Sequence, residues 1–162
     1  MKKSRVAFLG LFTAFAMILS FVESQIPTFV AIPGIKLGLP NIAIIIILYR
    51  FGWKEASIIS LLRVVLTSLL FGTVLSMLYS IAGAVLSLVA MILLKKVLST
   101  VTISVIGGVC HNIGQILVAI LVTETQQLLY YLPVLIISGV IAGIVVGIIA
   151  ALSVKKIEKI DL

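Results

Sequence analysis

The sequence has few charged residues, and this scarcity bounds its class. Charged residues make up 10% of the 162 residues, and hydrophobic residues make up 62%. A soluble domain carries about 25% charged residues. A water-exposed surface cannot be built from this composition, so we predict an integral membrane protein of the bacterial cytoplasmic membrane, embedded in the lipid bilayer.

Residues that carry catalysis or bind metals are also scarce. The only aspartate is Asp161, so no aspartate-rich motif can hold Mg²⁺ and a diphosphate. One histidine and one cysteine cannot form a conventional zinc site. No phosphate-binding P-loop occurs, so hydrolysis of ATP would need partner subunits. We therefore expect no catalytic residues, no metal and no cofactor, and a stand-alone enzyme is disfavoured.

The hydrophobic runs predict one domain over residues 1–162 with about six spans of roughly 20 residues each. All but two of the 12 Lys and Arg then lie on one side of the membrane, the exceptions being Lys36 and Arg63. By the positive-inside rule, both termini are cytoplasmic. The same clustering shows that the net charge of +7 sets topology and does not indicate a nucleic-acid partner. The predicted helices are residues 6–22, 41–51, 55–71, 73–94, 102–122 and 131–154.

The segment PGIKLGLPN, residues 33–41, interrupts this pattern with helix-breaking residues and a charge. It ends the first outside loop, residues 23–39, and Pro40 and Asn41 are typical of a helix start. The helix that follows rises about 16 Å, roughly half of the ~30 Å hydrocarbon layer. Arg50 and Lys54 hold its far end at the cytoplasmic face. We therefore predict a half-length second helix and a re-entrant loop that dips to meet it.

Several polar residues are predicted near one depth in the membrane. At 1.5 Å per residue, Asn41, Arg63 and His111 fall near the midplane, with Lys36 slightly above and Glu23 at the rim. A buried arginine costs at least ~2.5 kcal/mol, so it either lines a wet cavity or forms an ion pair, for example with Glu23.

His111, Asn112 and Gln115 share one face of their helix, either to bind a ligand or to hydrogen-bond a neighbouring helix. Tyr79 either contacts the ligand or packs in the core. The start of the second helix should add unpaired N–H groups and a positive dipole, which favour an anionic ligand. Lys36 fits the same site, or is simply solvated. The predicted ligand-binding residues are Glu23, Lys36, Asn41, Arg63, Tyr79, His111, Asn112 and Gln115.

Small residues mark two close-packing faces. Gly10 and Ala14 lie one turn apart on the first helix and are predicted to let another helix approach. Gly139, Gly143, Gly147 and Ala151 recur at four-residue spacing on the last helix, as a face for another helix of the bundle or of a partner.

Taken together, these motifs resemble one family over nearly the whole chain. They are Glu23, PGIKLGLPN, LLR at residues 61–63, FG at 71–72, LYS–AG at 78–83 and HNIGQ at 111–115. The family is labelled Gx transporter or heptaprenyl diphosphate synthase component I. It is similar to the substrate-binding S components of energy-coupling factor (ECF) transporters, six-helix membrane proteins whose first outside loop closes over a small ligand. The resemblance implies that Gly10 and Ala14 dock a shared transmembrane subunit that works with ATPases.

Two functions follow from the sequence. The first is a membrane subunit that binds a small, anionic or polar organic solute for uptake. The second is an accessory or scaffold protein in quinone, prenyl diphosphate or extracellular electron-transfer pathways, with the polar cluster holding a lipid-like head group.

Overall fold

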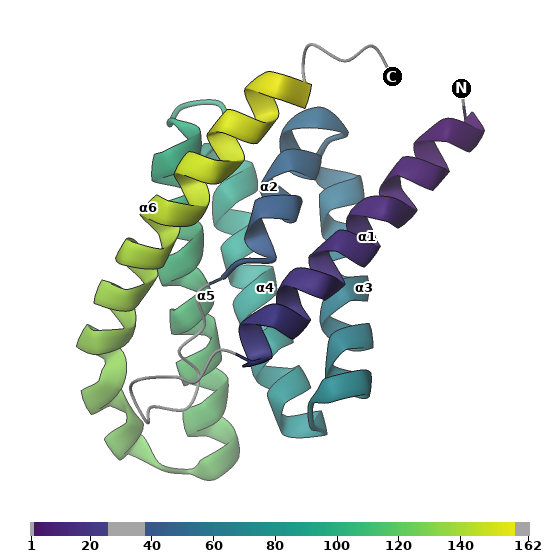
Figure 1. Cartoon of the computed structure of the whole chain (residues 1–162). Helices are drawn as coiled ribbons and strands as arrows, with labels where there is room; N and C mark the ends of the chain where they lie inside the picture. Colours follow the sequence, from purple (N-terminus) through teal and green to yellow (C-terminus); the bar gives the residue numbers. More distant parts are fainter. Residues whose placement is uncertain (1, 26–37, 158–162) are drawn as a thin grey trace.

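The computed structural model describes residues 2–25 and 38–157, which fold into helices without strands (Figure 1). The all-helical class is therefore confirmed, and most helix bounds agree with the prediction within two residues, although the first helix is longer at both ends. One difference is a short 3₁₀ helix where a loop and the start of the last helix were expected. The elements are α1 (Lys2–Gln25), α2 (Asn41–Arg50), α3 (Trp53–Phe71), α4 (Val74–Leu94), α5 (Thr100–Thr123), η1 (Gln126–Tyr131) and α6 (Leu132–Ile157).

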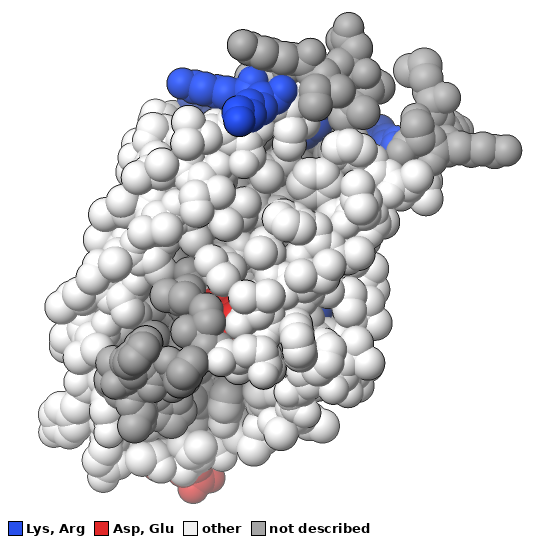
Figure 2. Space-filling model, in the orientation of Figure 1, with Lys and Arg blue, Asp and Glu red and all other residues white. Residues whose placement is uncertain are grey.

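Among the described residues, four segments are long and apolar enough to cross a membrane: α1 from Arg5, α4, α5, and α6 together with η1. Helix α2 is apolar but has only 10 residues. Helix α3 has 19 residues and includes three charges, Lys54, Glu55 and Arg63. The chain is thus a membrane protein with four candidate spans, and the count of six spans and the orientation stay predictions. On the face shown in Figure 2, Lys and Arg side chains gather at the end where α1 begins and α6 ends (Figure 1), and the rest of this face shows few charged atoms.

Helix α2 lies in the centre of the bundle, in contact with α1, α3, α5 and α6 (Figure 1). Seven successive residues, from Ile42 to Leu48, are buried. A helix that is apolar on every side is stable only when neighbours surround it. Two glycines with positive φ, Gly38 at 72° and Gly52 at 109°, frame α2 and allow the sharp turns into it and out of it.

Helix α5 is held between α4 and α6 by glycine faces. A Cβ atom added to Gly143 of α6 would lie 2.5 Å from the Val105 Cα of α5, and one added to Gly114 of α5 would lie 2.7 Å from the Ala82 carbonyl oxygen of α4. Backbones that approach this closely leave no room for side chains. The glycine face predicted on the last helix therefore packs inside the bundle, on α5.

Helix α1 lies at the edge of the bundle and contacts α2 and α3. Its buried face carries Phe12, Ala16 and Ser20, one turn apart. Gly10 and Ala14 are exposed on the opposite side, and a Cβ atom at Gly10 would meet nothing within 4 Å. The predicted small-residue face of α1 is thus not used by the described part of this chain.

Candidate ligand-binding site

A small cavity lies at the N-terminal tip of α2, inside the bundle. It measures about 20 Å³, and a cavity of roughly 10–15 Å³ suffices for one water. Polar groups from α5 meet the start of α2 there, and glycines of α6 close one side. The lining residues are Gly38, Asn41, Ser104, Gly108, His111, Asn112, Gly139, Ala142, Gly143 and Val146.

The first turn of α2 satisfies its own backbone donors, which corrects one expectation. The N–H groups of Asn41, Ile42 and Ala43 donate to the carbonyl oxygens of Gly38, Leu39 and Pro40, at 2.9, 3.1 and 3.1 Å. Such 3₁₀-type bonds are one of the ways in which helix ends pair their free groups. Side chains, rather than the predicted unpaired N–H groups, therefore supply the donors in this cavity.

Helix α5 supplies three polar side chains to the cavity, and all three are buried: Ser104, His111 and Asn112. The Asn112 Nδ2 atom donates to the Leu135 carbonyl oxygen of α6 at 2.7 Å and lies 3.4 Å from the Ser138 hydroxyl. Asn112 thus connects α5 to α6 by a hydrogen bond, which is one of the two roles that the sequence left open. It also lines the cavity.

Arg63 is buried on α3 but is not among the residues that line this cavity. Its Nη1 atom donates to the Ser20 hydroxyl of α1 at 3.4 Å. The Nε and Nη2 atoms are buried without a hydrogen-bond partner among the described residues. The Glu23 carboxylate lies close enough to interact electrostatically with this guanidinium. A second polar centre therefore lies between α1 and α3.

Glu23 connects the two centres. Its carboxylate accepts a hydrogen bond from the Gly38 N–H group, and Gly38 lines the cavity. The same carboxylate acts electrostatically on Arg63. The end of α1 is thereby tied both to the start of α2 and to α3, so the predicted polar residues form two neighbouring groups instead of one.

Two other predicted residues, Gln115 and Tyr79, do not line the cavity. Gln115 faces α4, since its Cγ atom is 3.0 Å from the position of a Cβ atom at Gly83, and its Oε1 atom is buried without a hydrogen bond among the described residues. Tyr79 is half-buried on α4 and does not line the cavity. Lys36, and most of the loop predicted to be re-entrant, fall outside the described residues.

Sequence reasoning missed Ser104. It lies seven residues before His111, so two helical turns place both on one face of α5, and it lines the cavity. This seven-residue spacing is the sequence feature that could have identified Ser104 as a site residue.

Comparison with known proteins identifies a family for the chain. No curated protein and no solved structure matches the chain significantly. A family match does cover residues 12–153, which include every described residue of both polar centres. The chain therefore belongs to the family described as heptaprenyl diphosphate synthase component I, the Gx transporter family.

Proposed function

We propose that this protein is a substrate-binding membrane subunit, similar to the S components of ECF transporters, for uptake of a small polar solute that carries an anionic group. The cavity at the tip of α2 receives the solute, and Asn41, Ser104 and His111 bind it. Both termini and the basic end face the cytoplasm, and the cavity is reached from the outer side.

The observation that supports this proposal most is the position of the cavity. In the middle of an apolar bundle, polar side chains of α2 and α5 converge on one hollow, although burying such groups in a membrane protein is costly without a purpose. The positive end of the α2 dipole points to the same hollow. The buried Arg63 guanidinium and the Glu23 carboxylate lie together beside the cavity, so this pair adds little net charge and the preference for an anion rests on the helix dipole.

The energy for uptake would come from other subunits. Gly10 and Ala14 are exposed on α1, with open space beside Gly10, which fits a transmembrane partner that approaches closely. In this proposal, that partner couples the subunit to ATPases, and the protein itself is not an enzyme.

The test starts with mass spectrometry of the small molecule that stays bound to the gently purified full-length protein. Calorimetry with that compound then compares the wild type with His111→Ala and Arg63→Ala. We expect His111→Ala to weaken binding by about tenfold or more, as removal of a charge-assisted hydrogen bond does. Arg63 lies outside the cavity and is linked to it through Glu23 and Gly38, so Arg63→Ala should weaken binding less.

Gln115→Ala is the matched control, because Gln115 is buried one turn beyond His111 but lies outside the cavity. Its affinity should stay at the wild-type value. Equal weakening by Gln115→Ala and His111→Ala would move the binding site away from the cavity. An unchanged affinity in Arg63→Ala would mean that the polar centre between α1 and α3 does not influence binding.

A second candidate is an accessory role in prenyl or quinone pathways. The description of the family names a prenyl diphosphate synthase component, and the partly unpaired Arg63 guanidinium among apolar helices suits a phosphate-bearing lipid. A co-purified prenyl or quinone lipid would favour this role, and a water-soluble compound would favour uptake.

A further inference from the structure

The last three residues of α2, 48–50, form the base of this helix, and the base ends without a regular backbone cap. The N–H groups of Phe51 and Gly52 both donate to the Ile47 carbonyl oxygen, at 2.8 and 3.2 Å. The next carbonyl, that of Leu48, therefore lacks the N–H group that a continuing helix would offer. Leu48 is fully buried, and a buried carbonyl oxygen without a donor is costly.

Lys95 supplies the missing donor. Its Nζ atom donates to the Leu48 carbonyl oxygen at 3.3 Å, and the dipole of α2 also favours a cation at this end. Lys95 follows the last residue of α4, and its own N–H group donates to the Met91 carbonyl oxygen at 3.0 Å. Met91 is buried in the same core cluster as the residues of α2. The end of α4 thus holds the base of α2 through a charged hydrogen bond.

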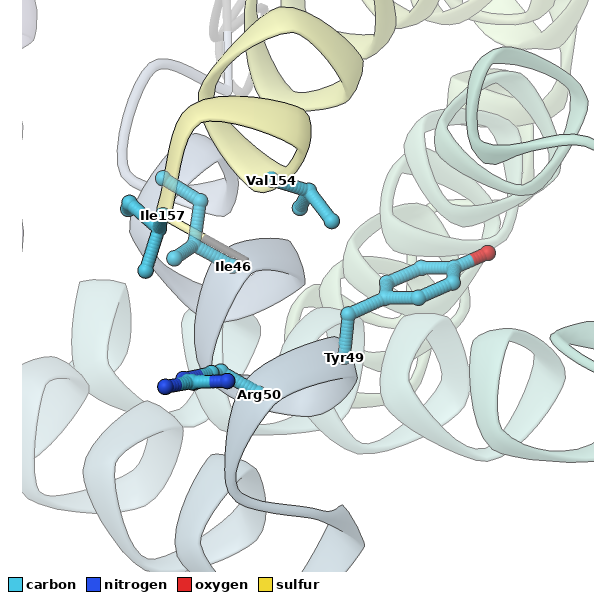
Figure 3. A pocket seen from close by; sticks show the side chains of 5 residues that line it. All are labelled: Ile46, Tyr49, Arg50, Val154 and Ile157. Carbon is cyan, nitrogen blue, oxygen red and sulfur yellow. The ribbon is translucent and has the colours of Figure 1, made fainter. Parts of the chain in front are cut away.

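The base of α2 is loosely packed where it meets the last turns of α6 (Figure 3). A cavity of about 90 Å³ lies there, several times the roughly 10–15 Å³ that admits one water. Protein interiors are normally close-packed, so this cavity leaves the base room to move toward α6. Lys95 is not among the residues that line it, which are Ile46, Tyr49, Arg50, Val154 and Ile157.

A movement of the base must reach the tip, because α2 is a short and regular helix. It has 10 residues, which span about 15 Å at 1.5 Å per residue. Its first residue, Asn41, lines the cavity at the tip. That cavity measures about 20 Å³, so a small displacement of the tip changes its volume by a large fraction.

We propose that Lys95 is a positioning residue for the solute site: it holds the base of α2 and thereby keeps the cavity at the tip narrow. When Lys95 leaves the Leu48 carbonyl oxygen, the base moves toward α6, the tip follows, and wider forms of the tip cavity become more populated. A residue at the predicted cytoplasmic end thus controls a cavity inside the bundle. The uptake of a solute by this cavity rests on the proposed function, whereas the control of its width does not.

The test measures the width of the tip cavity by the reactivity of a cysteine, and it uses no solute. Ser104→Cys places a thiol in the lining of this cavity, in a Cys110→Ala background that removes the only native thiol. Methyl methanethiosulfonate is too large for a cavity of about 20 Å³. Its rate of reaction with the full-length protein in detergent therefore reports how often the cavity widens, whether or not a solute binds there.

Lys95→Met removes the ammonium group but keeps an apolar stem. It should raise the rate of reaction by about tenfold, as loss of a charge-assisted hydrogen bond does. Lys95→Arg keeps a charged donor and should react at the rate of the parent protein.

Two variants are matched controls for Lys95→Met. Lys96→Met removes the neighbouring charge, which is exposed. Thr73→Ala removes the side chain that caps the opposite end of α4, and it should lower the unfolding temperature. Neither should change the rate of reaction. If Thr73→Ala raises this rate as much as Lys95→Met does, Lys95 acts only through general stability and the proposal is overturned.

A second pair of variants keeps every charge and changes the rate in the other direction. Val154→Phe fills the cavity between α2 and α6 and should slow the reaction, because the base has less room to move. Leu152→Phe, on an exposed face of the same helix, should not change the rate. This pair decides the question if Lys95→Met does not fold, as judged by thermal unfolding in detergent. The proposal is overturned if Lys95→Met reacts like Lys96→Met, or if Val154→Phe reacts like Leu152→Phe.

Discussion

Arg63 has fewer hydrogen bonds than a buried guanidinium can make. A guanidinium has five N–H donors, and the described residues give Arg63 a 3.4 Å bond to Ser20 together with the charge of Glu23. A buried charge with so little compensation destabilises a bundle unless a partner or water completes it. Glu23 is therefore expected to stabilise the protein mainly through Arg63.

A double-mutant cycle tests this coupling at the level of single residues. Glu23→Gln should destabilise the protein, since it removes the charge beside Arg63 but keeps an oxygen for the Gly38 N–H group. In an Arg63→Met background, Glu23→Gln should lower the free energy of unfolding by a smaller amount. The coupling energy between the two positions should be about 0.5–3 kcal/mol. Unfolding in detergent with increasing denaturant measures each free energy.

The control for this cycle is Glu124→Gln, because Glu124 is exposed beyond the end of α5. Its effect should add to that of Arg63→Met without coupling. If Glu23→Gln and Arg63→Met also add independently, Glu23 is not the counter-charge of Arg63.

Glycine faces hold the helices together, but the surroundings of Gly143 and Gly10 differ. Replacement by alanine should therefore have opposite effects on stability at these two positions. Gly143→Ala places a Cβ atom 2.5 Å from the Val105 Cα atom. Backbone atoms cannot move aside, so α5 and α6 must separate, at a cost of about 1–3 kcal/mol. Gly10→Ala meets open space and gains helix propensity, by up to about 1 kcal/mol.

Thermal unfolding of both variants in the same detergent measures the difference. Gly143→Ala should unfold at lower temperature than the wild type, and Gly10→Ala at the same or a higher temperature. A stable Gly143→Ala variant would mean that the α5–α6 contact is looser than described.

The sequence predicted the helices well because helix length and residue spacing can be counted along the chain. The half-length of α2 follows from the number of residues between Pro40 and Arg50, and the four-residue spacing from Gly139 to Gly147 follows from the period of a helix. Spacing shows which residues share a face, but it does not identify the neighbour. Only the structure assigns that face to α5.

The sequence could not show how the predicted polar residues are arranged around their helices. Depth along a helix can be counted, but the direction in which a side chain points around the helix depends on how neighbours pack. Asn112 therefore bonds to α6 while Gln115, three residues later, faces α4. Arg63 turns toward α1 and away from the cavity that His111 lines.

On the scale of the whole molecule, one end is basic, and a small acidic spot shows at the opposite end in the displayed view (Figure 2), the end where Glu124 follows α5. The positive-inside rule predicts that the basic end is cytoplasmic. Labelling of single cysteines in a Cys110→Ala background tests this in intact cells. We expect a membrane-impermeant maleimide to modify Glu124→Cys, and to modify Lys96→Cys only after the membrane is permeabilised.

Both positions are exposed, so each should react fully in detergent, which is the control for accessibility. The opposite pattern, with Lys96→Cys reacting in intact cells, would reverse the predicted orientation.

The size of the cavity at the tip of α2 has a kinetic consequence. At about 20 Å³, it has room for about one water, so under the proposed function an organic solute would require a wider form of the bundle. The measured dissociation constant then equals the intrinsic one divided by the fraction of molecules in that form. Variants that loosen the sparse contacts of α1 should therefore raise apparent affinity and speed association, without any change to the groups that touch the solute.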